Sequence, residues 1–208
     1  MTPTTSRAGQ GRRDELCDAA IGVIAREGMR GLTHRAVDRA AGVPEGTTSY
    51  YFRTRLALLV GVTERLLALD LADAAAAPPA APADLDLDTV VDLVTQIVTY
   101  WTGPGRERML ARYEISLESV RHPELRERFL ATGAALRATI GEAFARLGAP
   151  DPHRAGRDFA AMLDGLIYDQ LAGAGGPRSA AELRATIGQM LAGLLTAPQR
   201  ARRDRPRR

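Results

Sequence analysis

Residues 33–52, THRAVDRAAGVPEGTTSYYF, read as two short helices joined by a tight turn. Thr33 is placed to cap the first helix, because its hydroxyl can accept a hydrogen bond from an early helical N–H. Gly42 can adopt the left-handed conformation that ends a helix, and Pro44, which has no N–H, suits the first turn of the next one. The stretch therefore predicts a helix-turn-helix whose second helix begins near Glu45.

The predicted second helix carries small hydroxyl and phenol side chains, which suit the base edges of a DNA major groove. Base contacts read the sequence, whereas phosphate contacts fix the position of the protein. We expect base contacts from Glu45, Thr47, Thr48, Ser49 and Tyr50, with Gly46 allowing close approach of the backbone. We expect phosphate contacts from Thr33, His34, Arg35, Tyr51, Arg53 and Arg55, with Arg12 and Arg13 as further candidates. The alternatives are a core position for Tyr51, support of the helix start by Thr47, and a helix-dipole role for Glu45.

This segment, together with RTRLALL at 53–59, resembles the N-terminal domain of the TetR family of bacterial transcriptional repressors. The matching residues are Thr33, Ala41, Gly42, Val43, Gly46, Thr47, Tyr51, Phe52 and Arg55. Asp38 departs from the family pattern, which usually has Ala facing the second helix at this position. Its carboxylate either faces the N-terminus of the second helix, where the helix dipole favours an anion, or the local packing differs.

The composition predicts an all-α protein. Hydrophobic residues make up 45% of the 208 residues and aromatic residues only 5%, so the apolar content is largely Ala and Leu, the strongest helix formers. No apolar stretch approaches the ~18–20 residues that cross a bilayer, and we expect a cytoplasmic protein. The single cysteine, Cys17, excludes an intramolecular disulfide; we expect a buried structural thiol, with a redox sensor as the alternative.

Charge is distributed unevenly along the chain. All 28 basic residues are arginine, with nine against six acidic residues in 1–60, thirteen against eighteen in 61–197, and six against one in 198–208. A basic N-terminal region above an acidic middle suits a protein that presents one end to phosphates. The basic tail is expected to be disordered, with a second nucleic-acid contact as the alternative.

Helical periodicity predicts four helices, then a break in AAAAPPAAPA at 74–83, then five more. The first helix is expected from Arg12 to Glu27, Thr54 is a candidate cap for the fourth, and Asp88 for the fifth. The predicted division is a disordered N-terminus at 1–10, a helix-turn-helix domain at 11–57, a ligand-binding and dimerisation domain at 58–197, and a disordered tail at 198–208.

The family resemblance implies that the C-terminal domain encloses a cavity for a small-molecule effector, and that repression ends when the effector binds. We expect ligand contacts from Tyr100, Trp101, Met109, Arg112, Tyr113, Phe129, Phe144, Met162 and Tyr168, for each of which ordinary core packing is the alternative. The resemblance also implies a homodimer formed by the last two helices. Candidate interface residues are Phe159, Met162, Leu163, Leu166, Ile167, Ile187, Leu191 and Leu194; packing within one protomer is the alternative.

Other functions fit the sequence less well. The three histidines lie far apart, no nucleophile or metal-ligand motif is present, and no glycine-rich phosphate loop follows a strand, so we expect neither an enzyme nor a cofactor. A ligand-insensitive DNA-binding or architectural protein, and an activator of transcription, remain as alternatives to a repressor.

Overall fold

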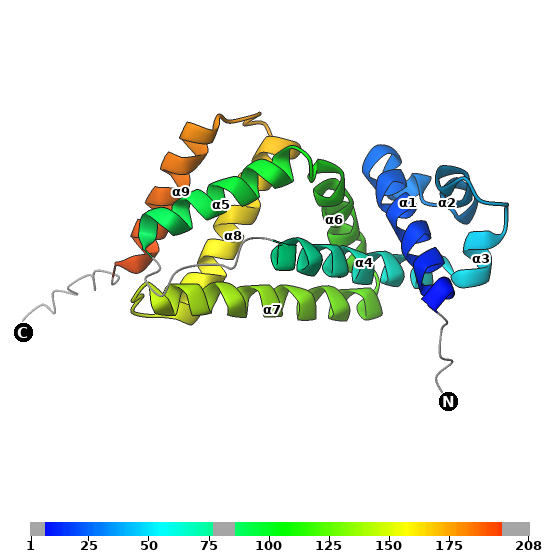
Figure 1. Cartoon of the computed structure of the whole chain (residues 1–208), viewed down its shortest axis with the longest axis horizontal. Coiled ribbons are helices and arrows are strands. Elements are labelled where there is room, and N and C mark those ends of the chain that lie inside the picture. The colour runs from blue at the N-terminus through cyan, green and yellow to red at the C-terminus, as the bar shows by residue number, and fades with distance from the viewer. Residues whose placement is uncertain (1–6, 77–85, 197–208) are drawn as a thin grey trace, which may run out of the picture.

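A computed structural model of the protein describes residues 7–76 and 86–196. Within these ranges the chain forms nine α-helices and no strand, as the composition predicted (Figure 1). The helices are α1 (Arg7–Gly31), α2 (His34–Ala41), α3 (Thr47–Tyr51), α4 (Arg55–Ala76), α5 (Leu87–Thr102), α6 (Arg106–Ser119), α7 (Pro123–Arg146), α8 (Pro152–Leu171) and α9 (Ala180–Leu195). The predicted basic tail lies outside the described residues, and among the described helices none is long and apolar enough to span a membrane.

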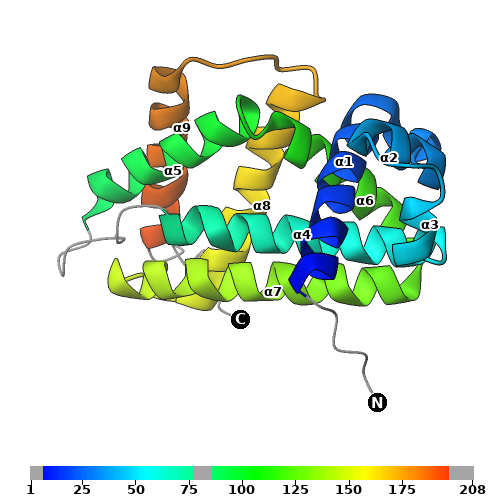
Figure 2. The same ribbon diagram turned by 45° about the vertical axis from the view of Figure 1, so that its right-hand side comes forward.

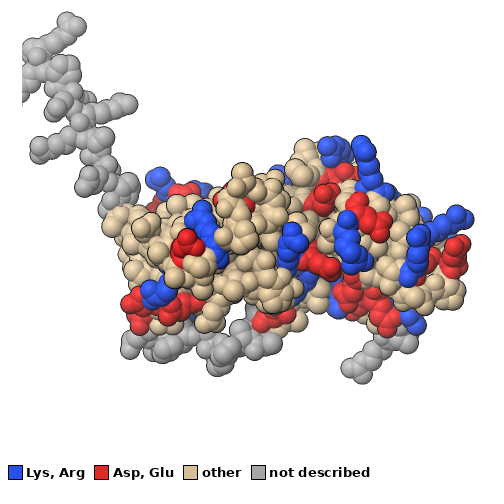
Figure 3. All heavy atoms as spheres, turned by 90° about the horizontal axis from the view of Figure 1, so that it is seen from above, with Lys and Arg blue, Asp and Glu red and all other residues tan. Residues whose placement is uncertain are grey.

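Helices α1–α3, which we call the head, lie at one end of the molecule, and α9 lies at the other (Figures 1 and 2). The long helix α4 leads from the head into the body, which consists of α4–α9, and α7 runs beside it in both views. Figure 3 shows arginine and acidic side chains interspersed over the head on the face seen from above.

Several helix boundaries follow from local sequence signals. Thr33 Oγ1 accepts a hydrogen bond from the N–H of Ala36 at 3.1 Å, and Gly42 adopts a left-handed conformation with φ of 65°. Thr54 Oγ1 likewise accepts from the N–H of Ala57 at 3.0 Å at the start of α4. The predictions for Thr33, Gly42 and Thr54 are therefore confirmed.

Three predicted boundaries are wrong. Helix α1 begins at Arg7, so its first four residues are helical where disorder was predicted. Helix α3 begins at Thr47 instead of near Glu45, because Gly46, with φ of 92°, is outside the helix. Helix α5 is capped by Asp86 instead of Asp88, two residues earlier than expected.

One hydrophobic core joins the head to the body. Phe52 and Leu59 are buried with side chains of α1, and Ala111 and Ile115 of α6 lie in the same cluster. Its buried members are Leu16, Cys17, Ala20, Ile21, Ile24, Leu32, Val37, Phe52, Leu58, Leu59, Val62, Leu66, Ala111, Ile115 and Leu125. Packing is thus continuous across the predicted domain boundary. A second core joins α5, α8 and α9 to single residues of α6 and α7.

Burial explains the state of the lone thiol. Cys17 is 3% exposed within the first core, and burial raises its pKa to about 12 despite the neighbouring Arg13. A thiol with this pKa is almost fully protonated at neutral pH and reacts slowly with oxidants. The structural interpretation of Cys17 therefore fits the structure better than a redox sensor.

Helices α7 and α8 cross at close range because two glycines face each other. A Cβ added to Gly156 would lie 2.7 Å from the backbone nitrogen of Gly141 and 2.9 Å from its Cα. Only a residue without a side chain fits here unless the helices separate.

We predict that Gly156→Ala lowers the free energy of unfolding by about 1–3 kcal/mol, because its Cβ forces α7 and α8 apart. Urea denaturation measures this change. Gly11→Ala in α1 is the control, because Gly11 is also helical and nothing lies within 4 Å of its added Cβ. It should gain up to about 1 kcal/mol from helix propensity. Equal stability of the two variants would contradict the close crossing.

Candidate functional site

A buried carboxylate fastens α3 to α2. Asp38, 1% exposed, accepts hydrogen bonds from the N–H of Gly46 at 2.8 Å and from the N–H of Thr48 at 2.7 Å. The hydroxyl of Thr48 donates to the same carboxylate at 2.5 Å. The departure from the family pattern at Asp38 is thus an anion at the N-terminus of the second helix.

The surroundings of Asp38 favour its charged form. Burial alone would raise the pKa of this carboxyl, but the hydrogen bonds from Thr48 and Gly46, and the nearby His34, outweigh burial and hold the pKa below its usual value. Asp38 is therefore ionised at neutral pH and stabilises the start of α3.

The prediction that Thr48 contacts a base is wrong. Its side chain is completely buried, and its hydroxyl is bound to Asp38. The other predicted base contacts keep access to solvent: Glu45, Gly46, Ser49 and Tyr50 are exposed, Tyr50 to 71%. Thr47 is half-buried, and its hydroxyl donates to the carbonyl of Pro44 at 2.6 Å.

Some of the predicted phosphate contacts are exposed, and the others are bound within the protomer. Thr33, Arg35 and Arg53 are exposed near α3, and Arg35 has only a loose ion pair with Glu45 at 3.8 Å. Tyr51 is half-buried and stacks edge-on against the neighbouring Tyr50.

Two other predicted phosphate contacts, His34 and Arg13, bind the backbone at the end of α3 instead. Nε2 of His34 lies 2.7 Å from the carbonyl oxygen of Phe52. Arg13 donates to the carbonyl of Tyr51 at 2.9 Å, and its guanidinium lies 4.3 Å from the centre of the Phe52 ring. These contacts hold α3 against α1 and α2, so Arg13 serves the fold of the head. Arg12 is exposed and pairs with Glu15.

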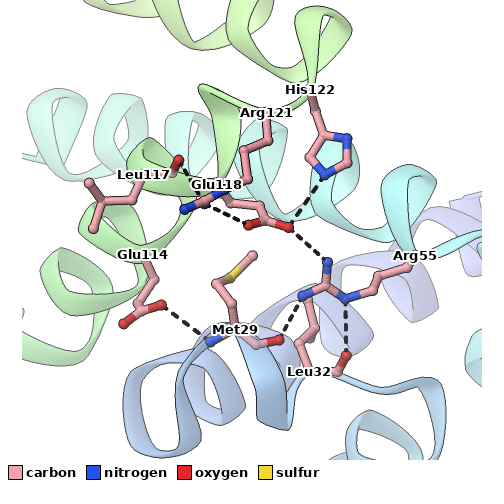
Figure 4. Close-up of polar contacts among 8 residues, drawn as sticks. All are labelled: Met29, Leu32, Arg55, Glu114, Leu117, Glu118, Arg121 and His122. Carbon is pink, nitrogen blue, oxygen red and sulfur yellow. Dashed lines mark hydrogen bonds and ion pairs between the residues drawn. The ribbon is translucent and has the colours of Figure 1, made fainter.

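Arg55 binds three groups of its own protomer. Its guanidinium donates to the carbonyls of Met29 at 2.6 Å and Leu32 at 3.4 Å, and to Glu118 of α6 at 3.1 Å (Figure 4). The predicted phosphate contact of Arg55 is therefore replaced by contacts within the protomer.

A polar cluster lies between α4, α5 and α6. Arg112 donates to Asp70 at 2.6 Å, and Arg108 donates to Asp73 at 2.7 Å and to the Tyr100 hydroxyl. Both guanidinium groups lie over the ring of Trp101, 5.2 and 5.3 Å from its centre. We call Asp70, Asp73, Tyr100, Trp101, Arg108 and Arg112 the polar cluster.

Three buried polar atoms of this cluster have no hydrogen-bond partner within the described chain: Asp70 Oδ1, Arg108 Nη1 and Arg112 Nε. Buried polar groups are nearly always paired, so each such atom needs an explanation. Arg108 also lines an open cleft of about 340 Å³ between α1, α4 and the start of α6, together with Leu69 and Pro104.

The other predicted ligand contacts are dispersed. Met109 and Phe144 are buried in the second core, and Phe129 packs against the first. Tyr113 donates to Asp164 and stacks on Tyr168. Met162 and Tyr168 lie on the surface, 42% and 47% exposed. Of the predicted set, Tyr100, Trp101 and Arg112 come together.

Most of the predicted dimer contacts are buried within one protomer, which fits the alternative stated for them. Those with 6% exposure or less are Phe159, Leu166, Ile167, Ile187 and Leu191. They pack with α5 and with each other in the second core. Leu163 and Leu194 are half-buried, and Met162 is exposed.

Comparison with known proteins identifies the family of this chain. The model of "Bacterial regulatory proteins, tetR family" matches residues 16–62, and that of "Tetracyclin repressor-like, C-terminal domain" matches residues 85–197. The chain belongs to the TetR family. It is 32% identical over 162 residues to the HTH-type transcriptional regulator BetI 2 of Chromohalobacter salexigens, covering 74% of this chain and 75% of the relative. It is 29% identical over 160 residues to BetI of Rhizobium meliloti, covering 76% and 77%.

A solved structure extends the similarity over most of the chain. The multidrug binding protein EbrR in complex with ethidium has a TM-score of 0.66 at 28% identity, covering 86% of this chain and 98% of EbrR. EbrR has also been crystallised with imidazole and with proflavin. This TetR-family chain is accordingly a transcriptional regulator with a helix-turn-helix head and a ligand-binding C-terminal domain.

Sequence reasoning missed Asp70, Asp73, Arg108 and Glu118. The only available signal was the spacing of Arg108 and Arg112, which places two arginines on one face of a helix. Their acidic partners, Asp73 and Asp70, are 35 and 42 residues away in the chain, so no local pattern connects them.

We predict that Thr48→Val lowers the free energy of unfolding by about 1–3 kcal/mol, because Asp38 loses a buried hydrogen bond. Urea denaturation measures it. The exposed Ser49→Ala is the control and should change the free energy by less than about 0.5 kcal/mol.

The same carboxylate makes stability depend on pH. Because the folded-state pKa of Asp38 is lowered, the stability that it contributes is complete above the unfolded-state pKa of about 4 and is lost as the pH falls through the folded-state pKa. The difference in unfolding free energy between the wild type and Asp38→Asn should therefore shrink in acid. A difference independent of pH between 7 and 3 would show that the charge of Asp38 does not stabilise α3.

Proposed function

We propose that this TetR-family regulator is a repressor that binds its operator as a homodimer and is released when a small molecule binds the polar cluster. The observation that carries this proposal is the position of α3. Asp38 holds the helix from its buried side, and Ser49 and Tyr50 face outward. A short helix held in this way can enter a major groove without losing its own support.

The exposed side chains of the head are proposed to make two kinds of DNA contact. Ser49 and Tyr50, with Glu45 and the backbone at Gly46, are proposed to contact base edges. Arg53, Arg35 and Thr33 are proposed to contact phosphates on either side.

A second copy of the chain fits the outer faces of α8 and α9. Their exposed small residues are Ala161 and Gly165 on α8, and Ala185, Ala192 and Gly193 on α9, with Met162 and Tyr168 beside them. Small residues let helices approach closely, and a twofold pair of these faces makes a four-helix interface. Pairing places two copies of α3 on one duplex, which supplies specificity that a single five-residue helix lacks.

The polar cluster is the proposed effector site. Its unpaired atoms comprise two N–H donors and one carboxylate oxygen, so an effector with both acceptor and donor groups would complete the hydrogen bonding. The related EbrR binds ethidium, imidazole and proflavin, which supports a small organic effector for this chain as well. Release from DNA requires that the effector binds the released conformation more tightly than the DNA-bound one.

We predict that Gly165→Glu abolishes dimerisation and with it operator binding, because it places a charged side chain in the proposed interface. Nothing lies within 4 Å of an added Cβ at Gly165, so the protomer itself should remain folded. Analytical ultracentrifugation measures the oligomeric state, and fluorescence anisotropy measures binding to a duplex selected from a random pool by the wild type. Gly11→Glu, another open helical glycine, is the control for dimerisation. A dimeric Gly165→Glu variant would refute this interface.

We further predict that a small-molecule screen will find a compound that raises the melting temperature of the DNA-free protein and releases it from the operator. Trp101→Leu should remove both effects, since it removes the ring against which Arg108 and Arg112 lie. Phe129→Leu, in the other core, is the matched control and should respond like the wild type. Stabilising compounds that never release DNA, or that act equally on Trp101→Leu, would argue against this site.

A further inference from the structure

The polar cluster holds two ion pairs, each formed by a single hydrogen bond between the two side chains. Arg112 donates to Asp70 at 2.6 Å, and Arg108 donates to Asp73 at 2.7 Å. A guanidinium and a carboxylate can form two parallel hydrogen bonds, so both pairs leave hydrogen-bonding atoms unused. Among the described residues, the buried side-chain atoms without a partner are Asp70 Oδ1, Arg108 Nη1 and Arg112 Nε. These three atoms define what a ligand of the cluster must offer.

The formal charges of the cluster cancel, because Asp70 and Asp73 each carry one negative charge and the two arginines one positive charge each. A flat cation such as ethidium would meet two guanidinium groups, which already lie 5.2 and 5.3 Å from the centre of the Trp101 ring. An anion would lie beside the unpaired oxygen of Asp70 and be repelled by it. A neutral ligand adds no charge that this partly buried site would leave uncompensated.

The unpaired atoms also specify the polar group of the ligand. The N–H groups of Arg108 and Arg112 need an acceptor, whereas Asp70 Oδ1 needs a donor. A primary amide provides both, since its carbonyl oxygen has two lone pairs and its NH₂ group has two hydrogens. A carboxylate provides only acceptors and an ammonium group only donors, so each leaves part of the cluster unpaired.

An open cleft of about 340 Å³ adjoins the cluster at Arg108, beside α1 of the head and the start of α6, two helices that lie side by side in Figure 1. Its apolar lining consists of Ile21, Leu69 and Pro104. The volume is at the lower end of the range for ligand pockets, which is about 300–1,000 Å³. This lining suits the apolar body of a small ligand whose polar end reaches Arg108.

The acidic side chains of the cleft are already bound to arginines. Asp18 accepts two hydrogen bonds from Arg65, both at 2.8 Å, and Glu107 pairs with Arg26 at 3.4 Å. Since these pairs balance their own charges, the cleft does not favour a charged ligand either.

We propose that the effector is a neutral molecule with a primary amide, or a group with the same donors and acceptors, on an apolar body. Its amide completes the hydrogen bonding of Asp70, Arg108 and Arg112, and its apolar body lies in the cleft against Ile21 and Leu69. This inference rests on the proposed function, because it names the ligand of the same polar cluster. It separates this chain from EbrR, which has been crystallised with the flat cation ethidium.

Three probes with the same alkyl chain and different polar ends test the ligand class. At neutral pH octanamide is neutral, octanoate is an anion and octylammonium is a cation. Trp101 is the single tryptophan of the chain, so its fluorescence reports binding at the cluster without DNA. Octanamide should bind the wild type at least about tenfold more tightly than either ion, the factor that one unmatched buried polar group typically costs.

A charge-removing variant tests the part played by Asp70. Asp70→Asn should strengthen octanoate binding by about tenfold, because the anion then meets two guanidinium groups without an opposing carboxylate oxygen. Asp88→Asn on α5 is the matched control. It removes the same charge outside the cluster, from a side chain that is 85% exposed, and should leave the order of the three affinities unchanged. An octanoate affinity that Asp70→Asn does not change would contradict the assignment of Asp70.

A second pair of variants locates the apolar body. Leu69→Ser should weaken octanamide binding about fivefold, since the alkyl chain loses apolar contact in the cleft. Leu71→Ser on the same helix, at a residue that is 62% exposed, should leave the affinity unchanged. Equal affinities of these two variants would place the apolar body outside the cleft. Circular dichroism shows whether each variant folds, and the wild-type comparison of the three probes provides the test where a variant does not.

The ligand class and the proposed function fail in different ways. The neutral effector is overturned if octylammonium or octanoate binds the wild type most tightly, or if none of the three probes changes the fluorescence of Trp101; operator binding is unaffected by either result. Octanamide that binds in the expected order but leaves the protein on its operator would overturn release at this site, with the ligand class intact. A wild type that binds random and selected duplexes equally would overturn the proposed function itself.

Discussion

The hydrogen bonds of Asp38 are the constraint on which the recognition surface depends. A helix of five residues is too short to be stable alone, because its few hydrogen bonds do not offset the free-energy cost of nucleating a helix. Asp38, which is buried, compensates by accepting three hydrogen bonds, one from Gly46 directly before α3 and two from Thr48 within it. The same bonds decide which side of α3 is buried. Because Thr48 faces Asp38, its neighbours Ser49 and Tyr50 face away from it, toward solvent.

Features that a few neighbouring residues determine could be predicted from the sequence. Thr33, Gly42 and Thr54 each act within three or four residues of their own position, and the structure shows each in its expected role. The direction in which a side chain points on a short helix is a different matter. Thr48 and Ser49 look alike in sequence, and only the packing of α3 on α2 distinguishes the buried hydroxyl from the exposed one. Arg55 depends on a break of α1 at Gly28 and on an acidic residue 63 positions later in the chain.

The apolar residues of α8 and α9 show a second limit of sequence reasoning. Helical spacing of Phe159, Leu166 and Ile187 indicates that they are buried, but not which surface covers them. In the structure they lie in one core with α5, which contacts both helices, and with Phe144 of α7, whose ring lies edge-on to that of Phe159. What remains on the outer faces is a set of small residues, including Gly165 and Gly193. Small exposed residues, which allow a second helix to approach closely, therefore indicate a possible contact surface better than the large apolar residues do.

Continuity of the first core gives the helix-turn-helix a mechanical link to the rest of the molecule. Ala111 and Ile115 of α6 fill space among the side chains of α1, so α6 cannot slide without disturbing the packing of the head. Close-packed interiors respond to such a displacement by moving as units instead of deforming locally. Hydrogen bonds strengthen this link. Glu114 of α6 accepts from the N–H of Met29, and Arg55 of α4 donates both to the carbonyl of Met29 and to Glu118 of α6. Phe52, which directly follows α3, lies in the same core, so the position of α3 and the packing of α6 are linked.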